Sequence, residues 1–353
     1  MTVTELMMQA KESYERPRTP RLCAETSVND IECNTIESLM IAHDYVESIP
    51  DLHAFPCLRK LHISRSISLS EFEQLDLSSI EELYVVFEKK EPIIKINLPK
   101  LKKLEVYISN NEDTQLSLFD AFDAVLDIRG CSSLEELHLR HCTGCEIKTD
   151  ALYTLKKFVC CDYKNYNFDL LNYTPNLVHL VATSCRLNKV DFLHLVPNLT
   201  FLDLTFNEIT NAEIIFQLSN LRALHIYRNP LEDIQKFKAL PFETFVTEKD
   251  RDFLMFVHSI GSSQFSAYSM LKSARKQDPK RKPFLQQIYD RQTDEQIYAR
   301  YFASGIKQNI EYHTSTEKNG RKNVLLSSDE LLEFVLQEYP FLSEFFGTKN
   351  EET

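Results

Sequence analysis

Two segments, LTFLDLTFN (Leu199–Asn207) and LRALHIYRN (Leu221–Asn229), decide the fold of this chain. Both follow the pattern L-x-x-L-x-L-x-x-N, and their first residues are 22 positions apart. Apolar patterns that return at a fixed period of about 20–29 residues indicate a stack of similar structural units. Because a single unit cannot bury its own apolar edge, each unit must pack against its neighbours.

The same frame continues upstream in weaker copies. An apolar residue opens each copy, and the nine starting positions are 36, 58, 80, 101, 134, 155, 177, 199 and 221. Seven of the eight steps between them are 21 or 22 residues long, and the step from 101 to 134 is 33 residues long. Chance does not produce such regularity, so we predict about nine repeats over residues 36–245.

Each copy also carries the alternation of a strand. Successive side chains of a strand point to opposite faces, so Leu202 and Leu204 are predicted to point into the core. Asn207 ends the strand and can satisfy backbone groups of the turn, as a buried backbone requires. Cys142 and Cys185 stand at the asparagine position of their copies, and we expect them to take the same place.

Over roughly residues 30–245 the chain resembles leucine-rich-repeat proteins. The resemblance implies an α/β solenoid, in which each repeat contributes one short strand to a curved parallel sheet on the concave face and a looser return segment. The 22-residue step looks like the short intracellular subclass of the family. The copies that contain Cys142 and Cys185 look like the cysteine-containing subclass found in substrate adaptors, so the subfamily stays open.

Two further features flank or interrupt the repeats. Residues 1–35 are predicted to form an N-terminal cap with a short helix near 3–14, because an open end would expose core leucines. The long step leaves an insertion at 109–133, which we interpret as a return segment with a helix on the convex side, a degenerate repeat being the alternative. The apolar residues at near-helical spacing are Leu116, Leu118, Phe119, Phe122 and Val125.

The C-terminal region, residues 246–353, has helical patterns in place of the repeat. Ser327-Ser-Asp-Glu330 is a capping box that opens one predicted helix. This region is either an extended cap on the last repeat, which we favour, or a small helical domain. The other helical patterns cover 247–260, 263–276 and 283–306.

Composition limits the classes of function. The net charge of −12 disfavours nucleic-acid binding over the whole surface, because phosphate affinity comes from cationic side chains. No apolar run reaches the ~18–20 residues needed to cross a bilayer, and the N-terminus lacks the apolar segment of a secretory signal. Together with nine cysteines, these features favour a reducing compartment, so we expect a cytoplasmic or nuclear protein.

Motifs of common enzyme sites are absent from the sequence. It contains no GxxxxGK[ST] or GxGxxG phosphate loop, no GxSxG elbow and no HExxH motif, and only six glycines. We therefore expect neither catalysis nor a cofactor nor a small-molecule substrate.

The positions beside the core leucines are predicted to face outward on the concave side. They are rich in tyrosine, phenylalanine, histidine and arginine, the side chains that act as anchors at protein interfaces. Aromatic residues also favour strands for structural reasons, but exposed aromatics carry a cost that binding would explain. The predicted partner-binding residues are His62, Tyr84, Phe87, Glu105, Tyr107, His138, Arg140, Asp203, Phe206, His225, Tyr227 and Arg228, with His141 beside them.

A cysteine cluster in the middle repeats has some features of a zinc site. Cys142-Thr-Gly-Cys145 has the C-x-x-C element of such sites, and Cys160 with Cys161 could complete four ligands. However, Cys142 and Cys160 fall at inward repeat positions, where a small buried thiol suffices. We therefore predict no metal, with zinc as a minor alternative.

A basic run follows the repeats. It could contact RNA or an acidic partner, or it could be a solvated helix end and loop. Both interpretations stay open for Lys272, Arg275, Lys276, Lys280, Arg281 and Lys282.

Together these features favour a non-enzymatic scaffold, a regulatory or assembly subunit that holds another protein or a macromolecular complex on its concave face. One alternative is a ribonucleoprotein- or ribosome-associated factor that contacts RNA through the basic segment 272–282. A second is a ubiquitin-ligase-type substrate adaptor, suggested by the cysteine-type repeats.

Overall fold

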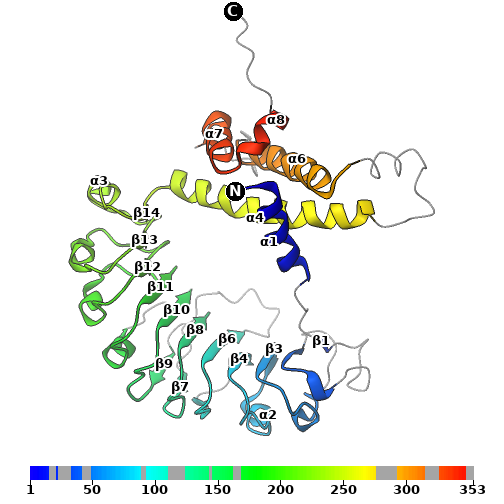
Figure 1. The fold of residues 1–353 in the computed structure, drawn as a ribbon. Coiled ribbons are helices and arrows are strands. Elements are labelled where there is room, and N and C mark those ends of the chain that lie inside the picture. Colours follow the sequence, from blue (N-terminus) through cyan, green and yellow to red (C-terminus); the bar gives the residue numbers. More distant parts are fainter. Residues whose placement is uncertain are drawn as a thin grey trace, which may run out of the picture. The chain divides into compact units, whose positions relative to one another are not determined.

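The computed structural model describes residues 1–15, 21–22, 33–41, 49–88, 93–109, 124–142, 145–161, 168–275, 292–314 and 326–346. The chain divides into two compact units (Figure 1). The repeat unit comprises Thr19–Val246, and the helical unit comprises Met1–Arg18 together with Thr247–Thr353.

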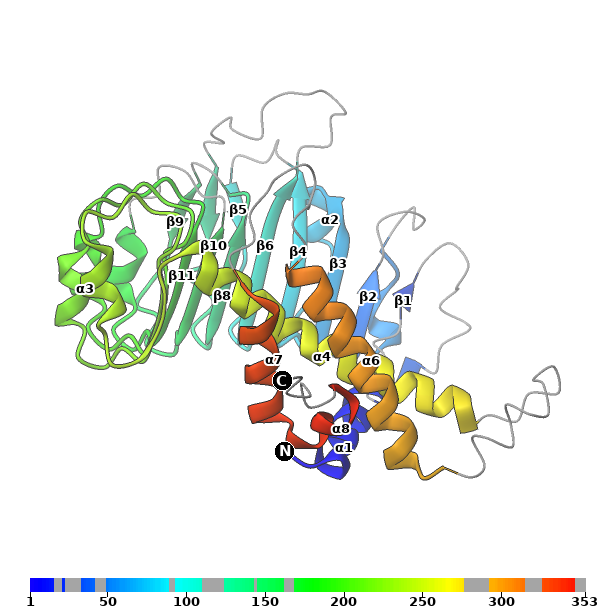
Figure 2. The ribbon, with the colours of Figure 1, turned by 90° about the horizontal axis from the view of Figure 1, so that it is seen from above.

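The described residues of the repeat unit form an 11-stranded parallel sheet that curves along its length (Figure 1). The view in Figure 2 shows its strands side by side. In spatial order the strands are β1 (Arg21–Leu22), β2 (Ser38–Ile41), β3 (Lys60–Ile67), β4 (Glu82–Glu88), β6 (Lys103–Ser109), β8 (Glu136–Arg140), β10 (Lys157–Cys161), β11 (His179–Thr183), β12 (Phe201–Asp203), β13 (Ala223–His225) and β14 (Glu243–Phe245).

The register of this sheet confirms the predicted repeat. Each of the nine predicted copies supplies a strand that begins two residues after its predicted starting position. The second apolar residue of every copy pairs with its equivalent in the next strand. This ladder runs through Leu39, Leu61, Leu83, Leu104, Leu137, Phe158, Leu180, Leu202 and Leu224.

The core of the repeat unit lies behind this ladder. Leu202, Leu204, Leu224 and Ile226 are each fully buried. Burial of one such side chain contributes about 1.5–3 kcal/mol, so stacking of the repeats is the main source of stability. The ladder ends at β14, where Thr244 takes the place of the leucine.

Asparagine closes the turn after the strand, as predicted. The buried Asn207 side chain accepts hydrogen bonds at Oδ1 from the backbone N–H groups of Cys185 (3.0 Å) and Leu187 (3.1 Å). Its Nδ2 donates to the carbonyls of Ala182 (2.7 Å) and Leu204 (2.8 Å). One side chain therefore satisfies four backbone groups across two repeats.

The residue before the asparagine or cysteine has a left-handed backbone. The φ angles are 55° at His141, 57° at Ser184 and Phe206, and 59° at Arg228. This conformation costs a non-glycine residue roughly 1–2 kcal/mol. Because it recurs at the same repeat position, we attribute it to the turn geometry of the repeat.

The convex side carries a second, three-stranded parallel sheet and short helices. The sheet consists of β5 (Ile93–Lys95), β7 (Val125–Asp127) and β9 (Glu146–Lys148). The predicted helix in the insertion is wrong at Val125, which lies in β7, and residues 110–123 are outside the described residues. The short helices of this unit are η2 (Cys33–Thr35), η3 (Leu52–Ala54), α2 (Leu69–Phe72), η4 (Asp169–Tyr173), η5 (Asp191–Leu195), η6 (Glu213–Gln217) and α3 (Ile234–Lys238).

The helical unit has a hydrophobic core of its own, which includes Phe256, Tyr298, Phe302 and Leu331. The predicted capping box is present at Ser327, where both reciprocal hydrogen bonds with Glu330 form. The helices are α1 (Val3–Glu15), α4 (Glu248–Arg275), α6 (Asp294–Thr314), α7 (Ser328–Glu338), η7 (Pro340–Leu342) and α8 (Ser343–Phe346). No described helix is both long enough and apolar enough to cross a membrane.

Close packing of α4 on α6 makes the core compact. A Cβ atom at Gly305 would lie 2.9 Å from Ser263 Oγ, so glycine allows the approach. Asn309 Nδ2 donates to Ser259 O (3.0 Å) and to Ser263 Oγ (2.8 Å) across the same contact.

Two expectations about the helices differ from the structure. The helix predicted near 3–14 is present as α1, but it belongs to the helical unit, in whose core Leu6 and Ala10 are buried. The patterns at 247–260 and 263–276 form one helix, α4, because Ile260 and Ala267 face the same core on either side of Gly261. The favoured extended cap therefore has a self-contained core, as expected of a small helical domain.

Candidate functional site

The concave face presents two outward rows of side chains, one on each side of the buried leucine ladder. Row one contains Ser38, Lys60, Glu82, Lys103, Glu136, Lys157, His179, Phe201 and Ala223. Row two contains Met40, His62, Tyr84, Glu105, His138, Val159, Val181, Asp203 and His225.

The structure brings six predicted partner-binding residues together in row two. They are His62, Tyr84, Glu105, His138, Asp203 and His225. Tyr107 and Arg140, two residues further along their strands, pair with each other on the same face. Their placement on one surface is established, and their role in binding stays a prediction.

The prediction for Phe87 is wrong, because this side chain is fully buried. Strand alternation puts it on the same face as Leu83 and Val85, which point into the core. Its ring packs edge-on against Phe72, with centroids 5.1 Å apart. Counting in twos from Leu83 would have excluded it from the concave face.

Three predicted residues lie beyond the ends of their strands. Phe206 follows β12, and Tyr227 and Arg228 follow β13. The Phe206 ring is 47% exposed and meets Tyr227 in a T-shaped contact with centroids 5.3 Å apart. These residues form a rim at the ends of the strands.

Row one contains residues that the sequence analysis missed. His179 and Phe201 stack with ring centroids 4.1 Å apart and an interplanar angle of 8°. Both stand directly before the second apolar residue of their copies, a position that recurs every 21 or 22 residues. The repeat pattern therefore already indicated that these two residues face outward.

Ion pairs link the charged residues of row one between β3 and β10. Lys60 Nζ lies 2.6 Å from Glu82 Oε1. Glu136 Oε2 is shared by Lys103 at 3.9 Å and Lys157 at 3.8 Å. Alternating charges on adjacent strands thus neutralise one another, a favourable cross-strand arrangement.

His138 is a buried polar residue of this face, with its side chain only 9% exposed. Its Nδ1 lies 3.7 Å from Glu105 Oε2 and its Nε2 3.3 Å from Glu136 Oε2, yet neither nitrogen has a hydrogen-bond partner among the described residues. Burial lowers its pKa, an effect opposed by the charge of Glu105. The ring is therefore neutral at pH 7.

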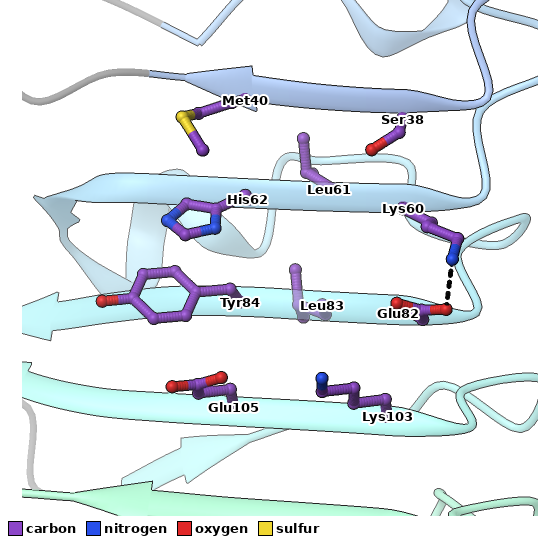
Figure 3. Close-up of a pocket in the computed structure, with 10 residues that line it drawn as sticks. All are labelled: Ser38, Met40, Lys60, Leu61, His62, Glu82, Leu83, Tyr84, Lys103 and Glu105. Atoms are coloured by element: carbon purple, nitrogen blue, oxygen red, sulfur yellow. Dashed lines mark ion pairs between the residues drawn. The ribbon is translucent and has the colours of Figure 1, made fainter. Parts of the chain in front are cut away.

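A hollow of about 370 Å³ opens over β2, β3, β4 and β6 (Figure 3). His62 and Tyr84 stack within it, with ring centroids 3.9 Å apart and an interplanar angle of 17°. The charged and polar side chains at its edge are Ser38, Lys60, Glu82, Lys103 and Glu105, and Met40 lies beside His62 (Figure 3).

The face over β11, β12 and β13 has a different chemistry. Phe201 stacks on His179 and meets His225 edge-on, with centroids 5.0 Å apart. Among the six residues that the two rows take from these strands, Asp203 is the sole carboxylate, and it lies 3.5 Å from His225 Nδ1. The remaining members, Val181 and Ala223, are apolar.

The geometry argues against zinc at the cysteine cluster. Cys160 and Cys161 are consecutive strand residues and point to opposite faces of the sheet, so they cannot share a metal with Cys142 and Cys145. Burial raises the pKa of the Cys142 and Cys160 thiols well above the usual range and that of Cys145 to about 11. Among the described residues no group of three or more ligands could hold a metal ion.

These thiols act instead as weak donors in the turns. Cys142 Sγ donates to Arg140 O and Cys185 Sγ to Thr183 O, each at 3.3 Å. Cysteine thus fills the asparagine position as predicted, although it makes fewer backbone contacts than Asn207 does.

The basic run is described in part. Lys272 and Arg275 lie in the last turn of α4, whereas 276–282 are outside the described residues. Arg275 Nε lies 2.7 Å from Asp294 Oδ1, and its NH2 group donates to Gln292 O at 2.6 Å. Arg275 therefore joins α4 to the start of α6.

The chain matches no family model, and no curated protein matches it. It is similar to solved structures at low identity. With the TLR13–ssRNA13 complex it shares 17% identity over 60% of this chain and 36% of that one, with a TM-score of 0.41. With InlP of Listeria monocytogenes the values are 16%, 64% and 60%, with a TM-score of 0.33.

A third similar structure is the functional domain of InlJ from Listeria monocytogenes, described as including a cysteine ladder. It is 15% identical over 63% of this chain and 61% of that one, with a TM-score of 0.28. The chain thus spans about a third of the TLR13 chain and about 60% of InlP and InlJ. The assignment of the repeat rests on the strand register described above.

Proposed function

We propose that this chain, whose repeat unit has the strand register of a leucine-rich-repeat solenoid, is a non-enzymatic scaffold that binds another protein on its concave face. The observation that carries the proposal is the pair of outward rows, in which aromatic side chains are held in place by stacking on their neighbours. His62–Tyr84 and His179–Phe201 are such stacks. Large rigid side chains of this kind are typical anchors of protein interfaces.

The surface is also organised before a partner arrives. Within the 11-stranded sheet every strand from β2 to β13 is paired on both sides, so binding need not order a loop in this face. Ion pairs such as Lys60–Glu82 hold the long charged side chains as well. Binding therefore requires less ordering of the backbone and of the side chains than it would on a flexible surface, so less affinity is lost to conformational entropy.

The test is an affinity capture from cell extract with two matched variants. Tyr84→Ala/Phe201→Ala removes one aromatic anchor from each part of the concave face. The control, Tyr153→Ala/Tyr173→Ala, removes two tyrosines that are 67% and 46% exposed and lie outside both rows. We expect a partner retained by the wild type and the control and lost from the concave variant. A partner retained by all three proteins would contradict the proposal.

The RNA-associated alternative is tested in the same experiment. A partner that is kept by the concave variant, released by salt and lost when the six basic residues of 272–282 are neutralised would favour it. One of those residues, Arg275, already forms an ion pair with Asp294. This pairing is why the concave face is our first choice.

A further inference from the structure

We propose that the hollow over β2, β3, β4 and β6 receives an arginine side chain of the protein partner, with its guanidinium stacked on the His62–Tyr84 pair and donating to Oε2 of Glu105. The inference rests on the proposed function, and it names the chemistry that one part of the face recognises.

The stacked rings of His62 and Tyr84 offer an aromatic surface to a planar cation. His62 and Tyr84 are nearly parallel and both line the hollow, half-buried and therefore open on the solvent side (Figure 3). Burial is the main cause that lowers the pKa of His62, so its ring is uncharged at pH 7 and does not repel a cation. A planar guanidinium stacks on such rings through cation–π and dispersion contacts.

The Glu105 carboxylate follows Tyr84 in row two and can accept a hydrogen bond from the same cation. Glu105 lines the hollow, and its Oε1 accepts a hydrogen bond from Arg140 Nε at 2.8 Å. Its Oε2 lies 3.7 Å from Nδ1 of the neutral His138 ring. A half-buried carboxylate oxygen of this kind is a strong acceptor for a cationic donor.

The two lysines that line the hollow are already paired with carboxylates. Lys60 is paired with Glu82 at 2.6 Å, and Lys103 reaches Glu136 at 3.9 Å. Both lysines of the hollow are thus matched by carboxylates of row one, and Glu105 in row two is paired with Arg140 through Oε1, which leaves its Oε2 to meet the ligand. The protein carries a net charge of −12, which attracts a basic segment and repels an acidic one.

Arginine fits this arrangement better than lysine. Its guanidinium is flat and offers five donors in a fixed fork, so it can stack and bind a carboxylate at the same time. An ammonium group is a compact, strongly hydrated charge and cannot lie flat on an aromatic ring.

The experiment is a selection from a random peptide library on the full-length protein. Wild type is compared with Glu105→Gln and with Glu213→Gln, which removes an exposed carboxylate on η6 that is paired with Lys236. We expect wild type and Glu213→Gln to select peptides with arginine at one fixed position. A selected peptide should bind Glu105→Gln about tenfold more weakly, as expected for loss of a charge-assisted hydrogen bond.

Tyr84→Ala is a second variant, in case Glu105→Gln does not fold, and it should weaken the same peptide. Replacing the peptide arginine by lysine or by neutral citrulline should also weaken binding to wild type. Peptides enriched in aspartate or glutamate, peptides without arginine, or equal binding to wild type and Glu105→Gln would each overturn the arginine site. So would a selection that yields no peptide. The scaffold proposal is judged separately by the affinity capture.

Discussion

The two ends of the concave face share one backbone but differ in chemistry. Over β3, β4, β6 and β8 the outward side chains are mostly charged and paired, as in Lys60–Glu82. Over β11, β12 and β13 they are mostly uncharged, with the ring of Phe201 between His179 and His225. The inward apolar ladder runs through both parts, with Phe158 in place of leucine at β10 between them.

This difference separates the determinants of fold from those of binding. The inward positions must be apolar at every strand because the stack depends on them, so their identity repeats. The outward positions are free of that constraint, so two kinds of surface can be built on one register. A partner that covers both parts would meet ion pairs at one end and aromatic rings at the other.

The largest effect is expected from substitutions at the inward positions of the repeats. Leu202→Asp and Leu224→Asp place an unpaired charge at fully buried positions, and each should cost several kcal/mol and unfold the C-terminal repeats. Ala223→Asp on the outward face is the matched control and should melt close to the wild type. Thermal unfolding followed by circular dichroism measures the difference. Equal melting of all four proteins would mean that the register is wrong.

A smaller effect concerns the turn residue. Asn207→Ala leaves buried backbone groups of Cys185, Leu187 and Ala182 without partners, and it should cost about 2–3 kcal/mol. Asn207→Cys copies the residue at positions 142 and 185, and it should cost clearly less. Chemical denaturation gives both values. If the two variants are equally destabilised, cysteine does not substitute for asparagine in this turn.

The charged part of the face should respond to acid through His138. Its pKa is lowered in the folded state, so between the ordinary value of 6.5 and the folded value the unfolded chain binds more protons. The stability contribution is present above pH 6.5 and is lost as the pH falls through this window. His138→Gln should flatten this part of the stability–pH curve, whereas His258→Gln, at an exposed histidine of α4, should not. An unchanged curve for His138→Gln would rule out this role of burial.

The smallest effect is expected at the ion pair of row one. Lys60 and Glu82 are 52% and 40% exposed, so their coupling should be below about 1 kcal/mol and should fall with added salt. A double-mutant cycle with Lys60→Gln and Glu82→Gln measures it. A coupling well above this value, or one that salt does not change, would show that the pair is shielded from solvent.

Much of the repeat unit could be predicted because its determinants are local and periodic. Leu199 and Leu202 open one copy, and the other eight copies repeat this apolar spacing, whereas the asparagine recurs at Asn229. The capping box at Ser327 could be predicted for the same reason, since it lies within four residues. The outward histidines and Tyr84 of row two followed from strand alternation alone.

The remainder depends on contacts between residues far apart in sequence. Nothing in the pattern of α1 indicates that Leu6 packs with Phe256, because that choice depends on which apolar face is nearest after folding. The convex sheet pairs Val125 with Ile93, which the helical spacing of the insertion concealed. The prediction that Phe87 faces outward is wrong, because alternation from Leu83 puts it inside.

The central claim is that the partner lies on the concave face, and site-specific photo-crosslinking tests it most directly. A photoreactive phenylalanine derivative would replace Tyr84, Phe201 or the exposed Tyr153 in turn, and the protein would be irradiated in cell extract. The account predicts that Tyr84 and Phe201 give a crosslink to the same protein partner and that Tyr153 gives none. A crosslink from Tyr153 alone would place the partner elsewhere on the repeat unit and contradict the account.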